Sequence, residues 1–174
     1  IRQAKNDGID VYLEVTPHHL FLTVDDYETW GTLVQMNPPL RTKSDQDALW
    51  AGIKDGTIDT IGTDHAPHTL DEKHKPYGEA PSGVPGIETM LPLLLNAAHE
   101  GKLTLDDIVR LTHTNPAKIF HLEPNDDVVL VDLNKKKEVR NEDLKTKCCW
   151  SPFAGRTLTG WPVYTILRGQ VYKT

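Results

Sequence analysis

The sequence predicts an α/β fold, namely the C-terminal part of a (β/α)8 barrel (its last strands and helices) followed by a small β-rich tail domain. In the first half, β-prone runs alternate with a helical pattern, and histidine-rich polar residues directly follow each strand. Barrels of this class place their chemistry at the carboxyl ends of the strands. From about residue 125 the chain becomes β-rich. We therefore expect a barrel portion at 1–124 and a small β-domain segment at 125–174.

The first strand is predicted at residues 11–15, where Pro17 ends the pairing. A helical segment at 24–28 follows, with Thr23 as its expected N-cap. Residues 37–41 must form an irregular loop, because their two prolines remove backbone donors and disfavour helical conformation before each ring. A helix then starts near residue 43 and presents an apolar face at positions 48, 49 and 53.

A second short, buried strand is predicted at residues 60–63, closed by the polar run 64–68. After a loop at 69–86, the pattern predicts a helix at 87–99, another opening at Thr104, and a third with Pro116 in its first turn. In the tail we expect a strand at 128–133, a solvated lysine turn at 135–137 and a hairpin over 162–172. No helix is expected in this tail.

Composition narrows the classes of function. The chain has 174 residues, of which 38% are hydrophobic and 25% charged, and its net charge is −6. This is ordinary for a soluble globular protein. The acidity argues against a nucleic-acid partner, and no apolar run approaches the ~18 residues of a membrane span. No signal peptide is visible, and the adjacent Cys148 and Cys149 are poor disulfide candidates, so we expect a cytoplasmic protein.

The beginning of the sequence carries an expectation of its own. Residues 1–8 have no initiator methionine and resemble the end of a helix running into its stop signal. We therefore expect the chain to be the C-terminal part of a longer protein.

The densest chemistry lies in the run Asp-His-Ala-Pro-His at 64–68. A carboxylate such as Asp64 at a strand end can ligate a divalent metal or take a proton from a metal-bound water. His65 and His68 could bind metal or an anionic ligand, and loop packing is the alternative. Of the doublet His18-His19, at most one member could easily join a site, and we expect both to be structural. No GxGxxG, phosphate-loop, GxSxG or HExxH motif occurs.

Four segments together resemble those of dihydroorotases in the amidohydrolase superfamily. They are EVTPHHL at 14–20, NPPLR at 37–41, TDHAPHT at 63–69 and APSGVPGIET at 80–89. The NPA at 115–117 and the tail segments WSPF and GWPVYT fit as well. The resemblance implies a metal-dependent barrel with two zinc ions and a small β domain. It also implies reversible cyclisation of N-carbamoyl-L-aspartate to dihydroorotate, in pyrimidine (UMP) biosynthesis.

Matched by residue, the resemblance gives Asp64 the roles of metal ligand and catalytic proton shuttle. It places Asn37 and His68 on the carboxylate and ring of the substrate, and it places Ser82 and Gly83 on the ring through backbone groups. The other family zinc ligands have no counterpart in this sequence and would lie upstream, so we expect the chain to be inactive alone. The doublet at 18–19 matches no family metal ligand.

The resemblance further implies a homo-oligomer, with aspartate carbamoyltransferase as a possible partner. Two alternatives stay open at this point. One is a cyclic amidase similar to dihydropyrimidinase or allantoinase, whose hydantoin-type rings lack the carboxylate that His68 would bind. The other is a non-catalytic scaffold with the same fold, which would be recognised by loss of the upstream metal ligands.

Overall fold

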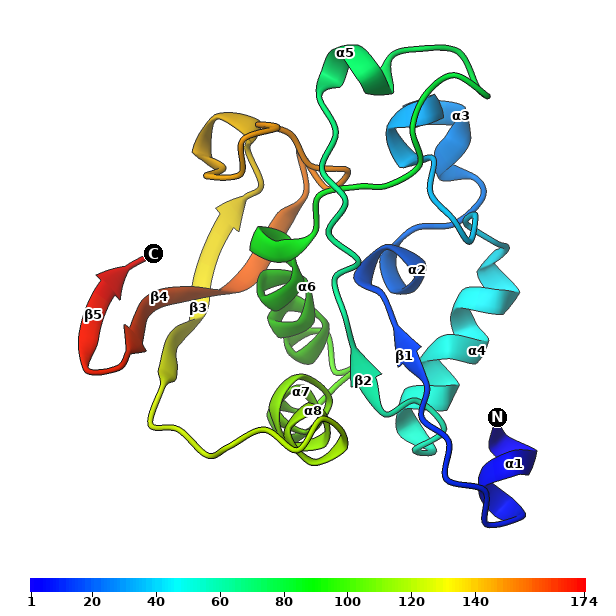
Figure 1. The fold of residues 1–174 in the computed structure, drawn as a ribbon. Coiled ribbons are helices and arrows are strands. Elements are labelled where there is room, and N and C mark those ends of the chain that lie inside the picture. Colours follow the sequence, from blue (N-terminus) through cyan, green and yellow to red (C-terminus); the bar gives the residue numbers. More distant parts are fainter.

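The computed structural model describes residues 1–174, and Figure 1 shows its arrangement. The α-helices are α1 (Arg2–Asn6), α2 (Pro17–Phe21), α3 (Asp26–Trp30), α4 (Lys43–Lys54), α5 (Leu70–Lys73), α6 (Ile87–His99), α7 (Leu105–Val109) and α8 (Asn115–Ile119). Shorter helical segments are η1 (Gly31–Val34), the π-helical η2 (Arg110–Thr114) and η3 (Asn141–Asp143). The strands are β1 (Glu14–Val15), β2 (Thr60–Ile61), β3 (Val128–Glu138), β4 (Thr157–Leu167) and β5 (Gln170–Lys173). None of the helices is both long and apolar enough to cross a lipid bilayer.

The first half is built on the strand–helix–strand unit that the sequence predicts. Strands β1 and β2 pair in parallel, with Glu14 opposite Thr60 and Val15 opposite Ile61. The chain between them contains α2, α3, η1 and finally α4. Helix α4 begins after Thr42, whose side chain forms a capping box with Asp45. Both strands are only two residues long, shorter than the predicted runs. Because the two strands are parallel, their carboxyl ends lie at the same edge of the pair, and the predicted site residues follow the strands at that edge.

Helix α6 lies between the two sheets and connects two hydrophobic clusters (Figure 1). Its buried Leu94 and Leu95 join the first cluster, which contains residues of β1, β2 and α4. Its Leu93 joins the second cluster, which includes Trp150 and Phe153 of the tail. The tail therefore packs against the segments near the carboxyl ends of the strands.

Strands β3, β4 and β5 form an antiparallel sheet in that order. The predicted hairpin is confirmed: Leu167 pairs with Gln170 across the two-residue turn Arg168-Gly169, whose φ values are +50° and +77°. Positive φ at both central positions matches the twist of a hairpin. The boundary at residues 124/125 stays a prediction.

Four local predictions are wrong. Thr23 does not cap α3, because Asp25 occupies the N-cap position and the Thr23 amide donates to the Asp26 carboxylate. The loop 69–86 contains α5, which a capping box between Thr69 and Glu72 initiates. The lysines at 135–137 lie within β3, beside an irregularity in its register with β4, and do not form a turn between two elements. The tail also contains the short helix η3, so it is not free of helix.

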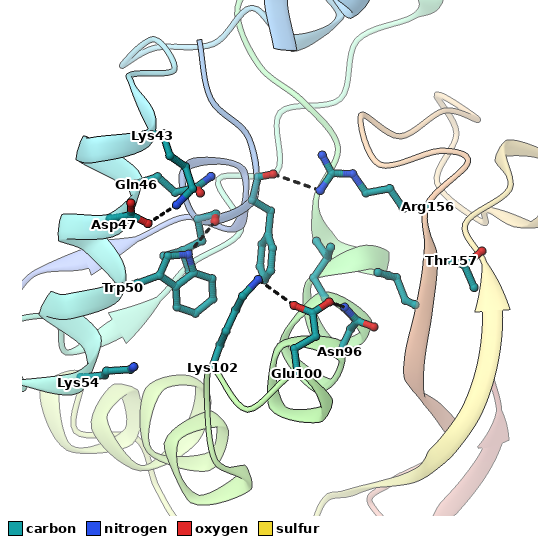
Figure 2. A pocket seen from close by; sticks show the side chains of 14 residues that line it. Lys43, Gln46, Asp47, Trp50, Lys54, Asn96, Glu100, Lys102, Arg156 and Thr157 are labelled. Atoms are coloured by element: carbon teal, nitrogen blue, oxygen red, sulfur yellow. Dashed lines mark hydrogen bonds and ion pairs between the residues drawn. The ribbon is translucent and has the colours of Figure 1, made fainter. Parts of the chain in front are cut away.

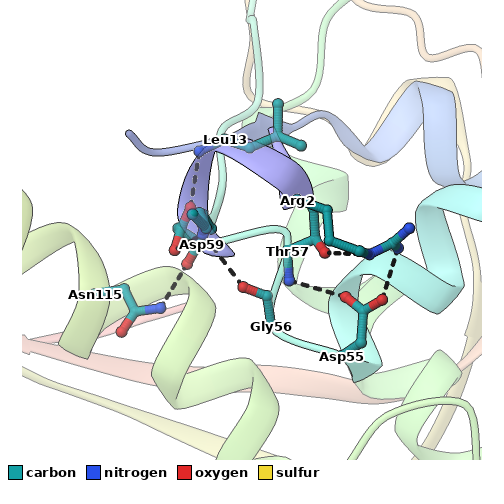
Figure 3. A network of polar contacts seen from close by, with 8 residues as sticks. Arg2, Leu13, Asp55, Gly56, Thr57, Asp59 and Asn115 are labelled. Atoms are coloured by element: carbon teal, nitrogen blue, oxygen red, sulfur yellow. Dashed lines mark hydrogen bonds and ion pairs between the residues drawn. The ribbon is translucent and has the colours of Figure 1, made fainter. Parts of the chain in front are cut away.

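Polar contacts hold the start of the chain against the amino-terminal end of the parallel pair (Figure 3). Lys5 donates to both carboxylate oxygens of Asp59, at 2.7 and 2.6 Å, and Asp59 also accepts from the Leu13 amide at 2.8 Å. Asn115 of α8 donates to the Asp59 carbonyl at 2.8 Å. Because Asp59 immediately precedes β2, this network joins α1, β1, β2 and α8 at one point.

Candidate functional site

Asp64 stands three residues beyond the end of β2, with its backbone in the left-handed region at φ +47° and its side chain exposed. This conformation costs a non-glycine residue on the order of 1 kcal/mol, and such residues cluster at functional sites. The surrounding loops must therefore hold Asp64 in place. The carboxylate is presented at the carboxyl end of the strand, as the sequence predicts.

The loop 82–86 packs directly on the segment that carries Asp64. The Nδ1 of His65 accepts a hydrogen bond from the Gly86 amide at 3.0 Å, and the Ala66 amide donates to the Val84 carbonyl at 3.1 Å. At Gly83, where φ is +127°, an added Cβ would lie 2.6 Å from the Cβ of Ala66. Only glycine allows this approach. The Nδ1 of His65 is therefore used in packing this loop, as the alternative to metal or anion binding predicts.

His68 is half-buried at the start of the turn leading into α5. Its Nδ1 lies 3.8 Å from a carboxylate oxygen of Glu72, and its carbonyl accepts from the indole of Trp150 at 2.7 Å. The tail thus supports the backbone of His68 while the imidazole stays partly accessible. This leaves the ring able to contact a ligand.

Asn37 is exposed, next to the buried Met36. His19 supports this segment: its Nε2 lies 3.0 Å from the Pro38 carbonyl, and its Nδ1 lies 2.6 Å from Oγ1 of Thr16. His19 thus links the segment after β1 to the loop carrying Asn37.

The neighbouring His18 is buried, and its Nε2 has no hydrogen-bond partner. Burial, followed by the proximity of His19, lowers the pKa of His18 to about 3. The ring is therefore neutral at physiological pH. The burial of His18 and the two hydrogen bonds of His19 fit a structural role for the doublet.

Sequence reasoning missed Lys73, which is completely buried. Its Nζ donates to the carbonyls of Gln35 at 3.0 Å, Pro81 at 2.8 Å and Gly83 at 2.9 Å. Burial lowers its pKa to about 8. The surrounding sequence LDEKHK reads as a solvated, charged turn, so composition gave no signal for a buried ammonium.

Gln35 also connects the segment before Asn37 to the loop that contains Ser82. Its side-chain amide donates to the Ala80 carbonyl at 2.9 Å, while its own carbonyl also accepts from the Gly83 amide at 2.9 Å. The Oε1 of Gln35 is buried without a partner. The segments around Asn37 and Ser82 are therefore held together by both backbone and side-chain contacts.

The residues of this chain do not by themselves form a metal centre. Nowhere in residues 1–174 do three or more His, Cys, Asp or Glu side chains gather closely enough to hold an ion. Zinc sites use about three or four protein ligands. Two zinc ions therefore do not fit the donor set of this chain, in which Asp64 is the single predicted ligand.

The chain also has a cavity of about 660 Å³ elsewhere, between α4, α6 and β4 (Figure 2). None of the predicted site residues lines it. Its polar groups are largely engaged within the chain: the Trp50 indole donates to the Leu20 carbonyl, Arg156 donates to the Phe21 carbonyl, and Lys102 pairs with Glu100. The predicted site is thus separate from this cavity.

No family model matches the chain. The sequence is, however, similar to curated proteins named dihydroorotase. That of Halobacterium salinarum is 46% identical over 90% of this chain and 39% of its own length, and that of Staphylococcus epidermidis is 43% identical over 98% and 42%. The chain spans about two fifths of the length of these relatives.

Solved structures agree in fold. The L-hydantoinase (dihydropyrimidinase) of Arthrobacter aurescens matches with a TM-score of 0.93 and 33% identity, over 98% of this chain and 41% of its own. The inactive dihydroorotase-like domain of a Chaetomium thermophilum CAD-like multifunctional protein matches with a TM-score of 0.76 and 32% identity, over 98% and 46%. The resemblance that the motifs indicate is therefore confirmed: over nearly its whole length the chain is similar in sequence to dihydroorotases and in fold to amidohydrolase-superfamily hydantoinases.

Proposed function

We propose that this chain is the C-terminal portion of a dihydroorotase, a cyclic amide hydrolase that interconverts N-carbamoyl-L-aspartate and dihydroorotate in pyrimidine biosynthesis. One observation carries this function. Just beyond the carboxyl end of β2, the segment that contains Ser82 is hydrogen-bonded both to the segment of Asn37 and to that of Asp64. These are the segments whose motifs resemble the family, and the similarity to named dihydroorotases supports the same conclusion.

In this proposal the unit β1–α4–β2 supplies the last two strands of a (β/α)8 barrel, within residues 1–124. Residues 125–174 belong to a small β domain. Parallel strands in such barrels carry catalytic groups at their carboxyl ends, and the exposed Asp64 stands at that end of β2. Zinc ions would serve the complete protein, with Asp64 as the one ligand from this chain.

Each predicted site residue of this chain then has a separate role in the reaction. The Asp64 carboxylate takes a proton from the attacking water and returns it to the departing amide nitrogen. His68 donates a hydrogen bond to the substrate carboxylate, and Asn37 binds the ring. Gly83 already uses its N–H and its C=O within the chain, whereas Ser82 makes no backbone hydrogen bond. The ring is therefore contacted by the backbone of Ser82, with Gly83 shaping the loop.

The test is a steady-state assay of the full-length protein with dihydroorotate, dihydrouracil and hydantoin. A dihydroorotase should strongly prefer dihydroorotate, the only one of the three with a free carboxylate. His68→Ala should lower kcat/KM for dihydroorotate by roughly 10- to 150-fold, which corresponds to about 1.5–3 kcal/mol for a charge-assisted hydrogen bond. Zinc content should not change.

His74→Ala is the matched control, because His74 is exposed beyond the end of α5. It should leave all three substrates unaffected. Loss of zinc in His68→Ala would instead make His68 a metal ligand and refute its proposed role.

The second candidate is a cyclic amidase of the hydantoinase type, which the TM-score of 0.93 to an L-hydantoinase favours. Preference for hydantoin or dihydrouracil over dihydroorotate would support it. A protein that turns over none of the three would fit a non-catalytic scaffold. A homo-oligomer, and a complex with aspartate carbamoyltransferase, are proposals that size-exclusion chromatography with light scattering would test.

A further inference from the structure

Lys73 joins three backbone segments through one buried ammonium group. A lysine ammonium has three N–H donors, and here each meets one carbonyl: those of Gln35, Pro81 and Gly83, at 2.8–3.0 Å. No carboxylate pairs with it. Burying a charge costs several kcal/mol unless its hydrogen bonds are satisfied. A large free-energy cost is thus offset by contacts to loop backbone alone.

The three connected segments are those that carry the predicted substrate contacts. Gln35 lies two residues before Asn37, and Pro81 and Gly83 flank Ser82. Lys73 itself ends α5, which begins two residues after His68. The Lys73 carbonyl also accepts from the Thr32 hydroxyl, so α5 is tied to η1 as well.

A gain in stability alone does not explain a charge at this position. Replacing a buried charged group by an apolar residue of similar volume is often neutral or stabilising. What an apolar side chain cannot do is hold three carbonyl oxygens around one point. The ammonium thus fixes the relative position of these loops.

We propose that Lys73 is a positioning residue, whose ammonium holds the segments of Asn37, His68 and Ser82 in the arrangement that binds the substrate. This inference rests on the proposed function for its kinetic consequence, although not for the loop geometry. Loops that contact the substrate equally in the ground and transition states affect KM more than kcat. Misplacement of contacts by about 1 Å can cost up to about 100-fold in rate or binding.

The test compares Lys73→Met and Lys73→Gln with two controls in the full-length protein. Methionine removes every donor at similar length, and glutamine keeps two donors without the charge. Lys75→Met changes an exposed lysine two residues away, and Ile53→Val weakens the first hydrophobic cluster without touching the loops. Lys73→Gln decides the result if Lys73→Met does not fold.

Two readouts are measured: hydrogen exchange of peptides covering residues 33–38 and 79–85, and the kinetics of dihydroorotate hydrolysis. In the Lys73 variants we expect faster exchange in both peptides and a KM raised on the order of 10-fold, with kcat changed less and zinc content unchanged. The controls should match the wild type in exchange of these peptides and in KM, although Ile53→Val should melt earlier.

Each result decides a separate point. If the two peptides exchange hydrogen at the wild-type rate in the folded Lys73 variants, Lys73 does not hold these loops together. Faster exchange with an unchanged KM would refute its role in substrate binding. If the wild-type protein does not hydrolyse dihydroorotate, the proposed function fails, and the exchange measurement still decides whether Lys73 holds the loops.

Discussion

The two ends of the parallel pair β1–β2 use aspartate in opposite ways. At the amino-terminal end, Asp59 accepts hydrogen bonds from the Lys5 ammonium and the Leu13 amide, so both of its carboxylate oxygens are engaged within the chain (Figure 3). At the carboxyl end, five residues further on, Asp64 is exposed and has a left-handed backbone conformation. The same side chain thus contributes stability at one end and stands accessible, at a conformational cost, at the other.

The lysines repeat this contrast. Lys5 at the amino-terminal end pairs with a carboxylate at 2.6 Å and stays partly exposed. Lys73 near the carboxyl end is completely buried and contacts only carbonyls. The partly exposed ion pair of Lys5 stabilises the fold with little loss of hydration. The buried ammonium of Lys73 loses its hydration, and its contacts instead fix the position of the loops.

The largest effect is expected from exchanging the two aspartates for asparagine in the full-length protein. Asp64→Asn should lower kcat by about 100- to 10,000-fold, because an amide cannot accept the proton. Its free energy of unfolding should change little. Asp59→Asn should retain kcat and lose about 2 kcal/mol of stability, since Lys5 loses a charged acceptor. Steady-state kinetics and urea unfolding check both.

Equal kinetic losses in the two variants would abolish the proposed contrast. Normal turnover by Asp64→Asn with normal metal content would show that another group moves the proton.

Gly83→Ala should destabilise the protein by on the order of 2–4 kcal/mol. The new Cβ would lie 2.6 Å from the Ala66 Cβ and 2.9 Å from its carbonyl oxygen, at a φ of +127°. The steric overlap and the backbone strain therefore both contribute to the loss of stability. Gly56→Ala separates the two causes, because Gly56 also has positive φ but nothing within 4 Å. It should cost only about 1 kcal/mol by urea unfolding, and equal losses would mean that packing between the loops is unimportant.

Acid sensitivity should originate near the carboxyl end, at His18. Its folded-state pKa of about 3 lies below its ordinary value of 6.5, so the unfolded chain binds a proton more readily as the pH falls. The stability contributed by the neutral ring is complete above about pH 6.5 and is lost as pH falls toward 3. Between pH 7 and pH 5 this loss amounts to about 2 kcal/mol.

His18→Leu should remove most of this slope, and the exposed His74→Leu should keep it. Urea unfolding at pH 5, 6 and 7 measures the difference. An unchanged slope in His18→Leu would assign the acid sensitivity to other groups.

The sequence predicted what local physics controls and missed what depends on contacts between distant segments. The crossover β1–α4–β2, the start of α6 after a glycine- and proline-rich loop, and the Arg168-Gly169 hairpin follow from periodicity, capping and turn chemistry. The position of Asp64 after a strand was predicted for the same reason. Lys73 was not, because its burial depends on three carbonyls from other loops.

The shortness of the strands has a similar origin. Residues 11–13 are β-prone, yet pairing begins only at Glu14, opposite Thr60. A ladder exists only where a partner strand lies alongside, and the partner here extends over two residues. Propensity alone cannot specify that length.

The smallest effect is expected within the amino-terminal network, from Arg2→Met. Arg2 donates to Asp55 at 2.6 Å, but its side chain is 61% exposed and that of its partner 43%. Exposed ion pairs contribute at most about 1 kcal/mol and are screened by salt, so we expect a loss below about 0.5 kcal/mol that vanishes in 1 M NaCl. Lys5→Met should cost more and respond less to salt, because its pair with Asp59 is 23% and 16% exposed. Urea unfolding at both salt concentrations compares them. A larger or salt-independent loss for Arg2→Met would show that the network acts as one unit rather than through the Lys5–Asp59 pair alone.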